Sequence, residues 1–297
     1  MNTSISRRTF LAGAVGALAA TTAQAAEPII DIHQHTHYWG RSDEGLIQHQ
    51  RALGVTKTVL LPAGSKFGLE AECYGNDSVL ALAKQHPNEF AFFANEVADL
   101  PEASTVIEKY LKAGAIGIGE QKFFVDCDSK HIELIAALAK DYNVPVLLHF
   151  QHGKYNTGYE RFHRVLEKFP RVNFIGHAQT FWGNIDRNHD QTVLYPKGSL
   201  TAGGLTDRWL ADYPNFYGDL SAGSGLNALQ RDEEFTKEFF RRHQNKLMYG
   251  SDCQDETTKD TRCSGIKCLE TVKRLSPTKK IERKILFENA RRVLKIK

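Results

Sequence analysis

The sequence predicts an α/β protein in which eight parallel strands alternate with helices and close into a single (β/α)8 barrel. Strand-like apolar runs recur eight times, and helix patterns lie between them. Most of the runs are uniformly apolar, as is typical of strands that are buried on both faces of a parallel sheet. The chain after its leader has about 270 residues, close to the roughly 250 of a typical barrel. No linker or composition break divides residues 26–297, so we expect one domain.

The expected strands share apolar, β-rich composition and cover residues 29–35, 57–62, 90–96, 115–121, 144–150, 172–178, 216–220 and 246–252. Asn76-Asp77, Ser129 and Asp232 precede helix patterns, as N-terminal capping residues do. The same alternation would also suit an open, doubly wound sheet. Eight units favour the barrel, and no Gly-X-Gly-X-X-Gly motif follows the first strand, which weakens a dinucleotide-binding alternative.

The first 25 residues resemble a twin-arginine export signal. Arg7 and Arg8 precede an apolar stretch, and Ala23-Gln24-Ala25 supplies small residues for cleavage. The apolar stretch is shorter than the roughly 20 residues that a membrane span requires. We therefore expect recognition by the twin-arginine export machinery, cleavage after Ala25, and a periplasmic or otherwise exported protein with no remaining membrane span.

The charge balance of the chain argues against a nucleic-acid partner. Lys and Arg together number 38, and Asp and Glu together number 35. Because removal of the leader also removes Arg7 and Arg8, the mature chain is close to neutral. Nucleic-acid-binding domains usually carry a basic patch or a high isoelectric point. The expected partner is a small-molecule substrate, and self-association remains open.

The chain has an odd number of cysteines, so at least one is unpaired; they are Cys73, Cys127, Cys253, Cys263 and Cys268. In an oxidising compartment, a Cys253–Cys263 bond or a Cys263–Cys268 bond would close a small loop after the last strand. Spacing alone does not decide between these pairings. No Cys-X-X-Cys motif points to a zinc finger or a thioredoxin-type centre.

Histidines end several of the predicted strands. The first strand ends in His33 and His35, whose spacing places both imidazoles on one side of a strand. A His-X-His pair is weak evidence by itself. Three later strand-like runs, however, end in His149, His177 and Asp252.

The carboxyl ends of barrel strands meet at one face, so these side chains should converge there. The converging set has metal-ligating groups and one lysine: His33, His35, Glu120, Lys122, His149, His177 and Asp252. Burying several ionisable groups together costs several kcal/mol each unless an ion pairs them. Imidazoles and carboxylates are also the usual ligands of zinc and similar ions, so the set predicts a metal centre.

Five segments occur in an order that resembles the signatures of the amidohydrolase superfamily: Asp31-Ile32-His33-Gln34-His35, Val146-Leu147-Leu148-His149, Asn173-Phe174-Ile175-Gly176-His177, Leu247-Met248-Tyr249-Gly250-Ser251-Asp252 and residues 284–292. The resemblance is greatest to the amidohydrolase-related (amidohydrolase 2) branch, which contains lactonases, other hydrolases and nonoxidative decarboxylases. It runs from the first strand to the last helix.

The resemblance implies a divalent ion that is held by His33, His35 and Asp252, with His149 as a further ligand. Zinc is the expected ion and manganese the alternative. By the same resemblance, His177 binds a second ion or contacts the substrate.

The number of ions depends on the fourth strand. Glu120 resembles a glutamate that bridges two ions in some branches, whereas other branches use a carbamylated lysine, for which Lys122 is the candidate. One or two ions are therefore expected. The sixth strand departs from the pattern, because related sequences more often place a glycine soon after the position of His177.

The implied ligand set predicts hydrolysis of a lactone, amide or ester in a small organic molecule. A bound dication lowers the pKa of its water from about 15.7 to about 7. Asp252 would act as general base and then as general acid. His177 or Lys122 would stabilise charge on the oxyanion. Asp252 and His177 are therefore the expected catalytic residues.

Three other functions remain open on the sequence. A nonoxidative decarboxylase would need a cation such as Arg187 or Lys154 to hold the substrate carboxylate. A phosphoester hydrolase would suit a binuclear site. A non-enzymatic metal binder would have a closed coordination shell, whereas catalysis needs an open position. The irregular stretch 180–206, after the sixth strand, is expected at the rim where βα loops meet substrate.

Overall fold

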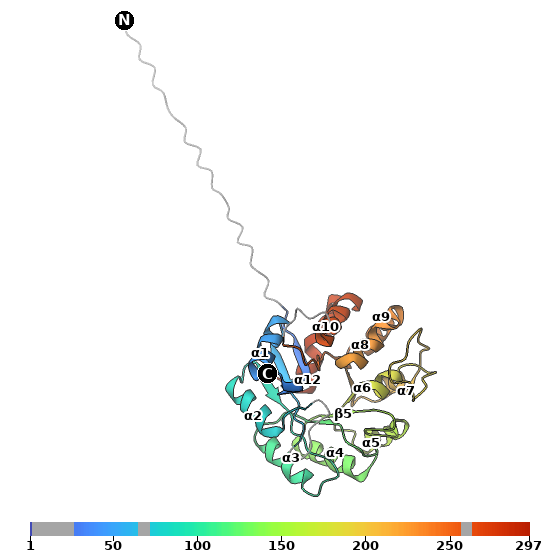
Figure 1. The fold of residues 1–297 in the computed structure, drawn as a ribbon. Coiled ribbons are helices and arrows are strands. Elements are labelled where there is room, and N and C mark those ends of the chain that lie inside the picture. The colour runs from blue at the N-terminus through green and yellow to red at the C-terminus, as the bar shows by residue number, and fades with distance from the viewer. Residues whose placement is uncertain (2–26, 65–71, 257–262) are drawn as a thin grey trace.

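The computed structural model describes residue 1 and residues 27–64, 72–256 and 263–297. The expected export signal is residues 1–25, and all of it after Met1 lies outside the described residues. The described chain folds as a barrel of parallel strands inside a ring of helices, as Figure 1 shows. This is the predicted α/β barrel.

Eight strands form the barrel wall: β1 (Ile30–Gln34), β2 (Lys57–Leu60), β3 (Phe90–Phe92), β4 (Ile118–Gln121), β5 (Val146–His149), β6 (Phe174–His177), β7 (Phe216–Asp219) and β8 (Leu247–Met248). They pair in parallel as β1-β2-β3 and β4-β5-β6-β7-β8. A bridge between Ala94 and Ile118 joins the two groups. The Ile32 amide donates to the Tyr249 carbonyl at 3.1 Å, which closes the wall between β8 and β1.

Twelve α-helical segments are described around the strands: α1 (Asp43–Ala52), α2 (Asn76–Gln85), α3 (Ala103–Lys112), α4 (Lys130–Tyr142), α5 (His163–Lys168), α6 (Ala178–Gly183), α7 (Leu205–Asp212), α8 (Ala222–Gln230), α9 (Glu233–His243), α10 (Ser264–Leu275), α11 (Lys279–Arg283) and α12 (Asn289–Val293). Ser129 and Asp232 cap α4 and α9, as predicted. Asn76 instead lies inside α2, whose capping position is Gly75. None of the described helices is both long enough and apolar enough to span a bilayer.

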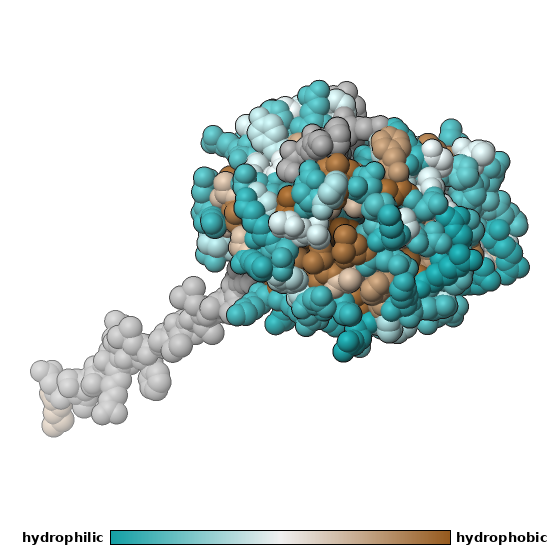
Figure 2. Space-filling view, turned by 90° about the horizontal axis from the view of Figure 1, so that it is seen from below, coloured by the Kyte–Doolittle hydropathy of each residue, from teal (hydrophilic) through white to brown (hydrophobic). Residues whose placement is uncertain are grey.

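Side chains along a strand point alternately to its two faces. In this barrel, one set packs in the interior and the other set packs against the helices. Leu147, Ile175, Tyr217 and Met248 belong to the cluster inside the barrel, which α12 closes at one end. Their neighbours along the strands pack outward against the helices. The surface is mainly polar with a smaller apolar area on the face seen in Figure 2. The residues whose side chains point into the barrel are therefore the ones that can reach its mouth.

A bulge in β1 interrupts the alternation of inward and outward side chains. Asp31 pairs with Thr58 and Gln34 pairs with Leu60, so three steps along β1 match two steps along β2. Ile32 lies in the inner core, and strict alternation would therefore turn His33 outward. The extra residue lets His33 follow Ile32 toward the interior, as bulges beside active sites commonly re-aim side chains.

A second bulge lies in β4, where Ile118 pairs with Val146 and Gln121 pairs with Leu148. Ile118 packs in the outer core, and without the extra residue Glu120 would share its outward direction. Gly119 makes the change of direction possible. Its φ is +137°, and a Cβ there would lie 2.6 Å from the Leu147 carbonyl oxygen.

Candidate active site

Five side chains from four parts of the barrel wall direct their polar atoms at one another. They are His33 on β1, His35 directly after β1, Glu120 on β4, His177 on β6 and Asp252, four residues after β8. The Nε2 atoms of His33 and His35 are 3.2 Å apart. The carboxylate oxygens of Glu120 and Asp252 lie 3.6–3.8 Å from the imidazole Nε2 atoms that they face.

Hydrogen bonds fix the ring orientations of the first two histidines. His33 Nδ1 lies 2.7 Å from Asp219 Oδ2, and His35 Nδ1 lies 2.7 Å from the Leu61 carbonyl oxygen. Both partners are acceptors, so in the neutral form of each ring Nδ1 carries the proton and Nε2 has the lone pair. The two lone pairs point into the group of five side chains.

His177 is oriented by the same carboxylate. Ser221 Oγ lies 3.1 Å from His177 Nδ1 and donates to Asp219 Oδ2 at 2.8 Å. Asp219 Oδ2 itself is 3.3 Å from His177 Nδ1. Asp219 thus supports two of the three imidazoles from behind, as carboxylates commonly do for metal-ligating histidines. Asp219 was not among the residues predicted from the sequence.

His149 lies beside the group of five. Its Nδ1 is 2.6 Å from Glu120 Oε1, and its Nε2 is 3.4 Å from Gln151 Oε1. The ring therefore donates to Glu120 and holds that carboxylate in place. The expectation that His149 ligates an ion directly stays a prediction.

Burial and neighbouring charges set the protonation states. Burial, with the charge of His33, lowers the pKa of His35 to about 4, and burial similarly lowers the pKa of His177 to about 4. Burial raises the pKa of Glu120, but His149 and His33 outweigh it and bring that pKa well below its usual value. Neutral imidazoles beside ionised carboxylates are the forms that bind cations.

The site attracts positive charge. Burial lowers the pKa of His33, but the negative charges of Asp252 and Asp219 more than offset this and raise that pKa well above its usual value. A cation bound at Nε2 would take the place of the second proton of this ring. Asp252 Oδ1 is buried and has no hydrogen-bond partner among the described residues. A buried oxygen of an ionised carboxylate is costly unless a cation or donor meets it. The donor set therefore fits a divalent ion.

Residues behind the site hold β1 against the segment after β8. Asp31 Oδ1 accepts from the His33 amide at 3.0 Å and from the Ser251 amide at 2.9 Å. Arg41 Nη1 donates to the Cys253 carbonyl at 2.6 Å, and Gln34 Nε2 donates to the same carbonyl at 3.0 Å. The Asp252 amide donates to the His33 carbonyl at 2.9 Å. Asp252 is thereby coupled to the His-X-His segment.

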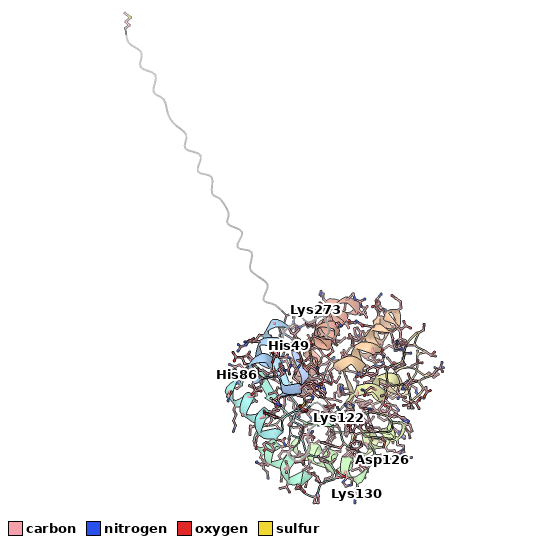
Figure 3. The ribbon with its side chains drawn as sticks, in the orientation of Figure 1. His49, His86, Lys122, Asp126, Lys130 and Lys273 are labelled. Atoms are coloured by element: carbon pink, nitrogen blue, oxygen red, sulfur yellow. The ribbon has the colours of Figure 1, made fainter. Side chains whose placement is uncertain are left out.

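Two lysines flank the site on the side of His149. The ammonium of Lys122 lies 5.5 Å from the centre of the Tyr155 ring, and that of Lys154 lies 5.1 Å from it. The Tyr155 ring meets the His149 ring edge to face at 5.5 Å. In Figure 3, Lys122 lies near the middle of the ring of helices. Positive charge therefore lies on the side of His149.

Other expected residues lie elsewhere. Arg187 is exposed and packs against Gly203. Trp182, within the stretch expected at the rim, is instead buried on α6 and donates to the Asp219 carbonyl at 2.9 Å. Gln179, two residues after His177, also lies on α6, and its Nε2 donates to the Tyr195 hydroxyl at 3.1 Å.

Solved structures of known proteins share this fold. An uncharacterised TIM-barrel protein from Bordetella bronchiseptica aligns with a TM-score of 0.64 at 16% identity, over 90% of this chain and 98% of its own. A probable 2-pyrone-4,6-dicarboxylic acid hydrolase from Acinetobacter baumannii gives 0.60 at 14% identity, over 90% and 99%.

A 5-carboxyvanillate decarboxylase from Novosphingobium aromaticivorans, solved with bound manganese, gives a TM-score of 0.53 at 13% identity, over 86% of this chain and 82% of its own. At these identities the likeness shows the fold alone. No sequence among the curated proteins matches the chain. The amidohydrolase family model, by contrast, matches residues 30–296. Because this match spans the whole barrel, the chain belongs to the amidohydrolase family.

Proposed function

We propose that the protein is a metal-dependent hydrolase that cleaves a lactone, amide or ester bond in a small organic molecule. The observation that carries the proposal is the convergence of His33, His35, Glu120, His177 and Asp252 at 3.2–3.8 Å. Ligand atoms that each lie about 2.0–2.2 Å from one ion are separated by distances of this order.

His33, His35 and Asp252 would hold the ion together with Glu120 and His177. Two sets of three side chains in the site could each hold an ion. One set is His33, His35 and Asp252, the other is His33, Glu120 and His177, and His33 belongs to both. His33 has one lone pair to offer, because its Nδ1 proton is bound to Asp219. The overlap therefore favours one ion over two.

The ion, zinc or manganese, would supply a Lewis acid that makes water nucleophilic near neutral pH. Manganese is bound in the solved decarboxylase from Novosphingobium aromaticivorans. Zinc suits the mixed imidazole and carboxylate set equally well. Metal analysis of the purified protein decides between them.

Asp252 is the proposed proton carrier. Its Oδ1 has no hydrogen-bond partner among the described residues, and its Oδ2 faces His177 Nε2 at 3.7 Å. An ionised Asp252 can accept the proton of the attacking water and return it to the leaving group. His177, neutral near pH 7, would orient the reacting oxygen. Lys122 and Lys154 would hold an anionic part of the substrate.

The test of hydrolysis is a substrate panel of small lactones, esters and amides, run with the metal-loaded protein in water enriched in 18O. The expected result is turnover with one solvent oxygen in the product, lost on removal of the metal and in Asp252→Asn. Cleavage that persists at the wild-type rate after complete metal removal would contradict the proposal.

A nonoxidative decarboxylase is the second candidate, since Lys122 and Lys154 flank His149 through Tyr155 and could hold a carboxylate. Decarboxylation of aromatic acids releases carbon dioxide and places no solvent oxygen in the organic product. The same panel, extended with hydroxybenzoates, therefore separates the two reactions. A phosphoester substrate would require the binuclear form of the site.

We also propose that the twin-arginine machinery exports the protein to the periplasm. The support is the order of Arg7-Arg8, an apolar stretch and Ala23-Gln24-Ala25 in the sequence. Fractionation of cells that express the wild type or an Arg7→Lys, Arg8→Lys variant tests this. The mature wild-type chain should appear in the periplasm, and the variant should remain as precursor in the cytoplasm.

A further inference from the structure

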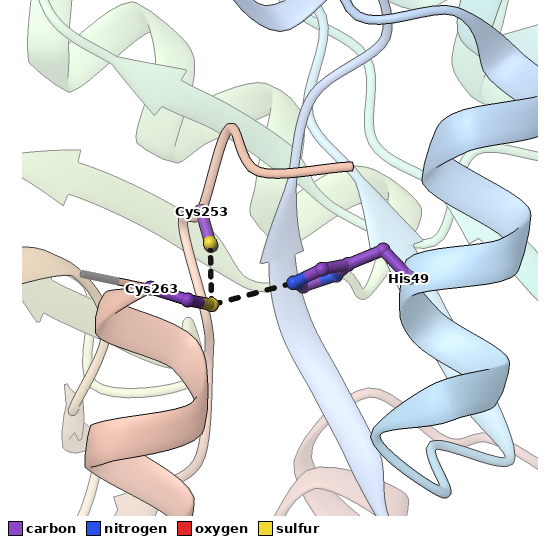
Figure 4. A group of neighbouring side chains, drawn as sticks. All are labelled: His49, Cys253 and Cys263. Carbon is purple, nitrogen blue, oxygen red and sulfur yellow. Dashed lines mark hydrogen bonds between the residues drawn. The ribbon is translucent and has the colours of Figure 1, made fainter. Parts of the chain in front are cut away.

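A second cluster of reactive side chains lies behind the candidate active site. Cys253 immediately follows Asp252, Cys263 precedes α10, and His49 lies on α1. The two Sγ atoms are 2.7 Å apart, and His49 Nε2 is 3.3 Å from Cys263 Sγ. Figure 4 shows the three side chains converging from different parts of the chain. All three are buried.

The two sulfurs have different surroundings. Cys263 Sγ accepts from the Ile266 amide at 3.5 Å, so it occupies the N-terminal cap of the twelve-residue helix α10. A helix N-terminus stabilises a thiolate. The hydrogen bond from Cys253, together with the Ile266 amide, lowers the pKa of Cys263. Cys263 is the nucleophile of the pair, and Cys253 is its partner.

The histidine orientation argues against a metal ion in this cluster. Thr58 Oγ1 donates to Gln50 Oε1, which leaves Gln50 Nε2 to donate to His49 Nδ1 at 3.4 Å. His49 Nε2 therefore carries the proton and offers no lone pair. Two thiolates on one tetrahedral zinc ion, each at about 2.3 Å, would also lie about 3.8 Å apart, well beyond the separation found.

We propose that Cys253 and Cys263 form a redox-responsive dithiol, which a disulfide oxidant converts to a disulfide bond that joins the segment after β8 to the start of α10. A hollow of about 240 Å³ reaches Cys253 and is lined by Asp252, Cys253, Gln254, Asp255 and Ser264. Cys263 Sγ lies 2.7 Å from Cys253 Sγ, behind this lining. This is the side from which the end of a small disulfide oxidant would reach the two sulfurs.

The reaction balances as thiol–disulfide exchange. The Cys263 thiolate attacks one sulfur of the oxidant, which forms a mixed disulfide and releases the first thiolate. Cys253 then loses its proton, for which Asp255 Oδ2 at 3.1 Å is the nearby base, and attacks Cys263 Sγ. The second oxidant thiolate leaves. Two protein thiols are oxidised, and one external disulfide is reduced to two thiols.

The bond would act on the segment that carries Asp252. The Cys253 carbonyl is already held by Arg41 and Gln34, and Gln34 lies between His33 and His35 in the sequence. Oxidation would restrict the same segment from its other side. Any effect on turnover rests on the proposed function, whereas formation of the bond does not.

Peptide mapping tests the bond directly. The full-length, metal-loaded protein is equilibrated with reduced and oxidised glutathione, quenched with acid, alkylated and digested with trypsin without reduction. Cys253, Cys263 and Cys268 fall in separate peptides, 247–259, 263–267 and 268–273. The expected product is peptide 247–259 joined to peptide 263–267. A link to peptide 268–273, or no link at any glutathione ratio, would overturn the proposal.

Matched variants provide the second readout. Oxidation should raise the thermal unfolding midpoint of the wild type and of Cys268→Ser, and it should leave the midpoints of Cys253→Ser and Cys263→Ser unchanged. Zinc analysis is the remaining arm. One equivalent of zinc that is lost in Cys263→Ser and that prevents the cross-link would show a metal site instead and refute the dithiol. Mapping and zinc analysis need no substrate, so failure here is distinct from failure of the hydrolase proposal.

Discussion

Replacement of Asp219 by asparagine should weaken metal binding without removing a ligand. Asp219 Oδ1 accepts from the Ser221 amide at 3.0 Å, and its Oδ2 faces His33 Nδ1 at 2.7 Å. In Asp219→Asn, the Ser221 amide keeps the carbonyl oxygen on its own side. The new NH2 group therefore faces His33 Nδ1 and donates to it. The proton of His33 then moves to Nε2, where the lone pair for the ion should be.

The magnitude follows from how such supporting carboxylates behave. Their loss typically costs 10-fold to 100-fold in metal affinity, or about 1.4–2.7 kcal/mol. The effect should lie near the upper limit, because Asp219 also supports His177 through Ser221. The measurement is competition for zinc between the protein and a chromophoric chelator, with turnover followed at saturating and at limiting zinc.

A matched control comes from another buried carboxylate that faces a histidine. Asp207 on α7 lies 2.6 Å from His243 Nε2, outside the group of five. Asp207→Asn should leave zinc affinity unchanged. Wild-type zinc affinity in a folded Asp219→Asn protein would refute the tautomer argument, and so would an equal loss in the control.

Three other predictions concern stability and substrate charge. Burial raises the pKa of Asp207, but hydrogen bonds from His243 and Arg242 outweigh it and lower this pKa to about 2. Because the pKa in the folded protein lies below that in the unfolded chain, the carboxylate stabilises the fold above about pH 4. This stabilisation is lost as the pH falls toward about 2. Asp207→Asn should therefore lower the free energy of unfolding by about 2 kcal/mol at pH 7 and by little at pH 2, as measured by denaturant titration. Gly119→Ala should destabilise by about 1–3 kcal/mol and reduce turnover, because its Cβ would meet the Leu147 carbonyl and displace Glu120; unchanged thermal unfolding would contradict this. Lys154→Met should raise KM about 10-fold to 100-fold for carboxylate-bearing substrates and leave KM for neutral analogues unchanged, and equal changes for both would contradict the proposed anion contact.

The order of elements could be predicted because the barrel repeats one simple pattern. Each uniformly apolar run in the sequence became a strand, and the runs were one to five residues longer than the strands. β8 shows the largest difference, since only Leu247–Met248 pair as a strand. The remainder of that run carries Asp252, whose φ of 42° places it outside extended geometry.

The supporting residues could not be predicted as readily. Asp219 lies two residues after Tyr217, so it also points into the barrel from β7. In the same way, His177 lies two residues after the inward-facing Ile175 of β6. A buried aspartate in an apolar strand was therefore the available signal. Arg41 had no such signal, because its contact with the Cys253 carbonyl joins residues 212 positions apart.

The bulges explain why strict alternation fails at the residues that matter most. Without the extra residue in β1, Gln34 would take the inner position and His33 would face the helices. The same holds for Glu120 in β4. β5 and β6 pair without interruption, and His149 and His177 reach the mouth by simple alternation. Two of the proposed ligand-bearing strands thus depend on a local irregularity that periodicity does not reveal. The site therefore depends on the register of β1 and β4 as much as on the identity of its histidines and carboxylates.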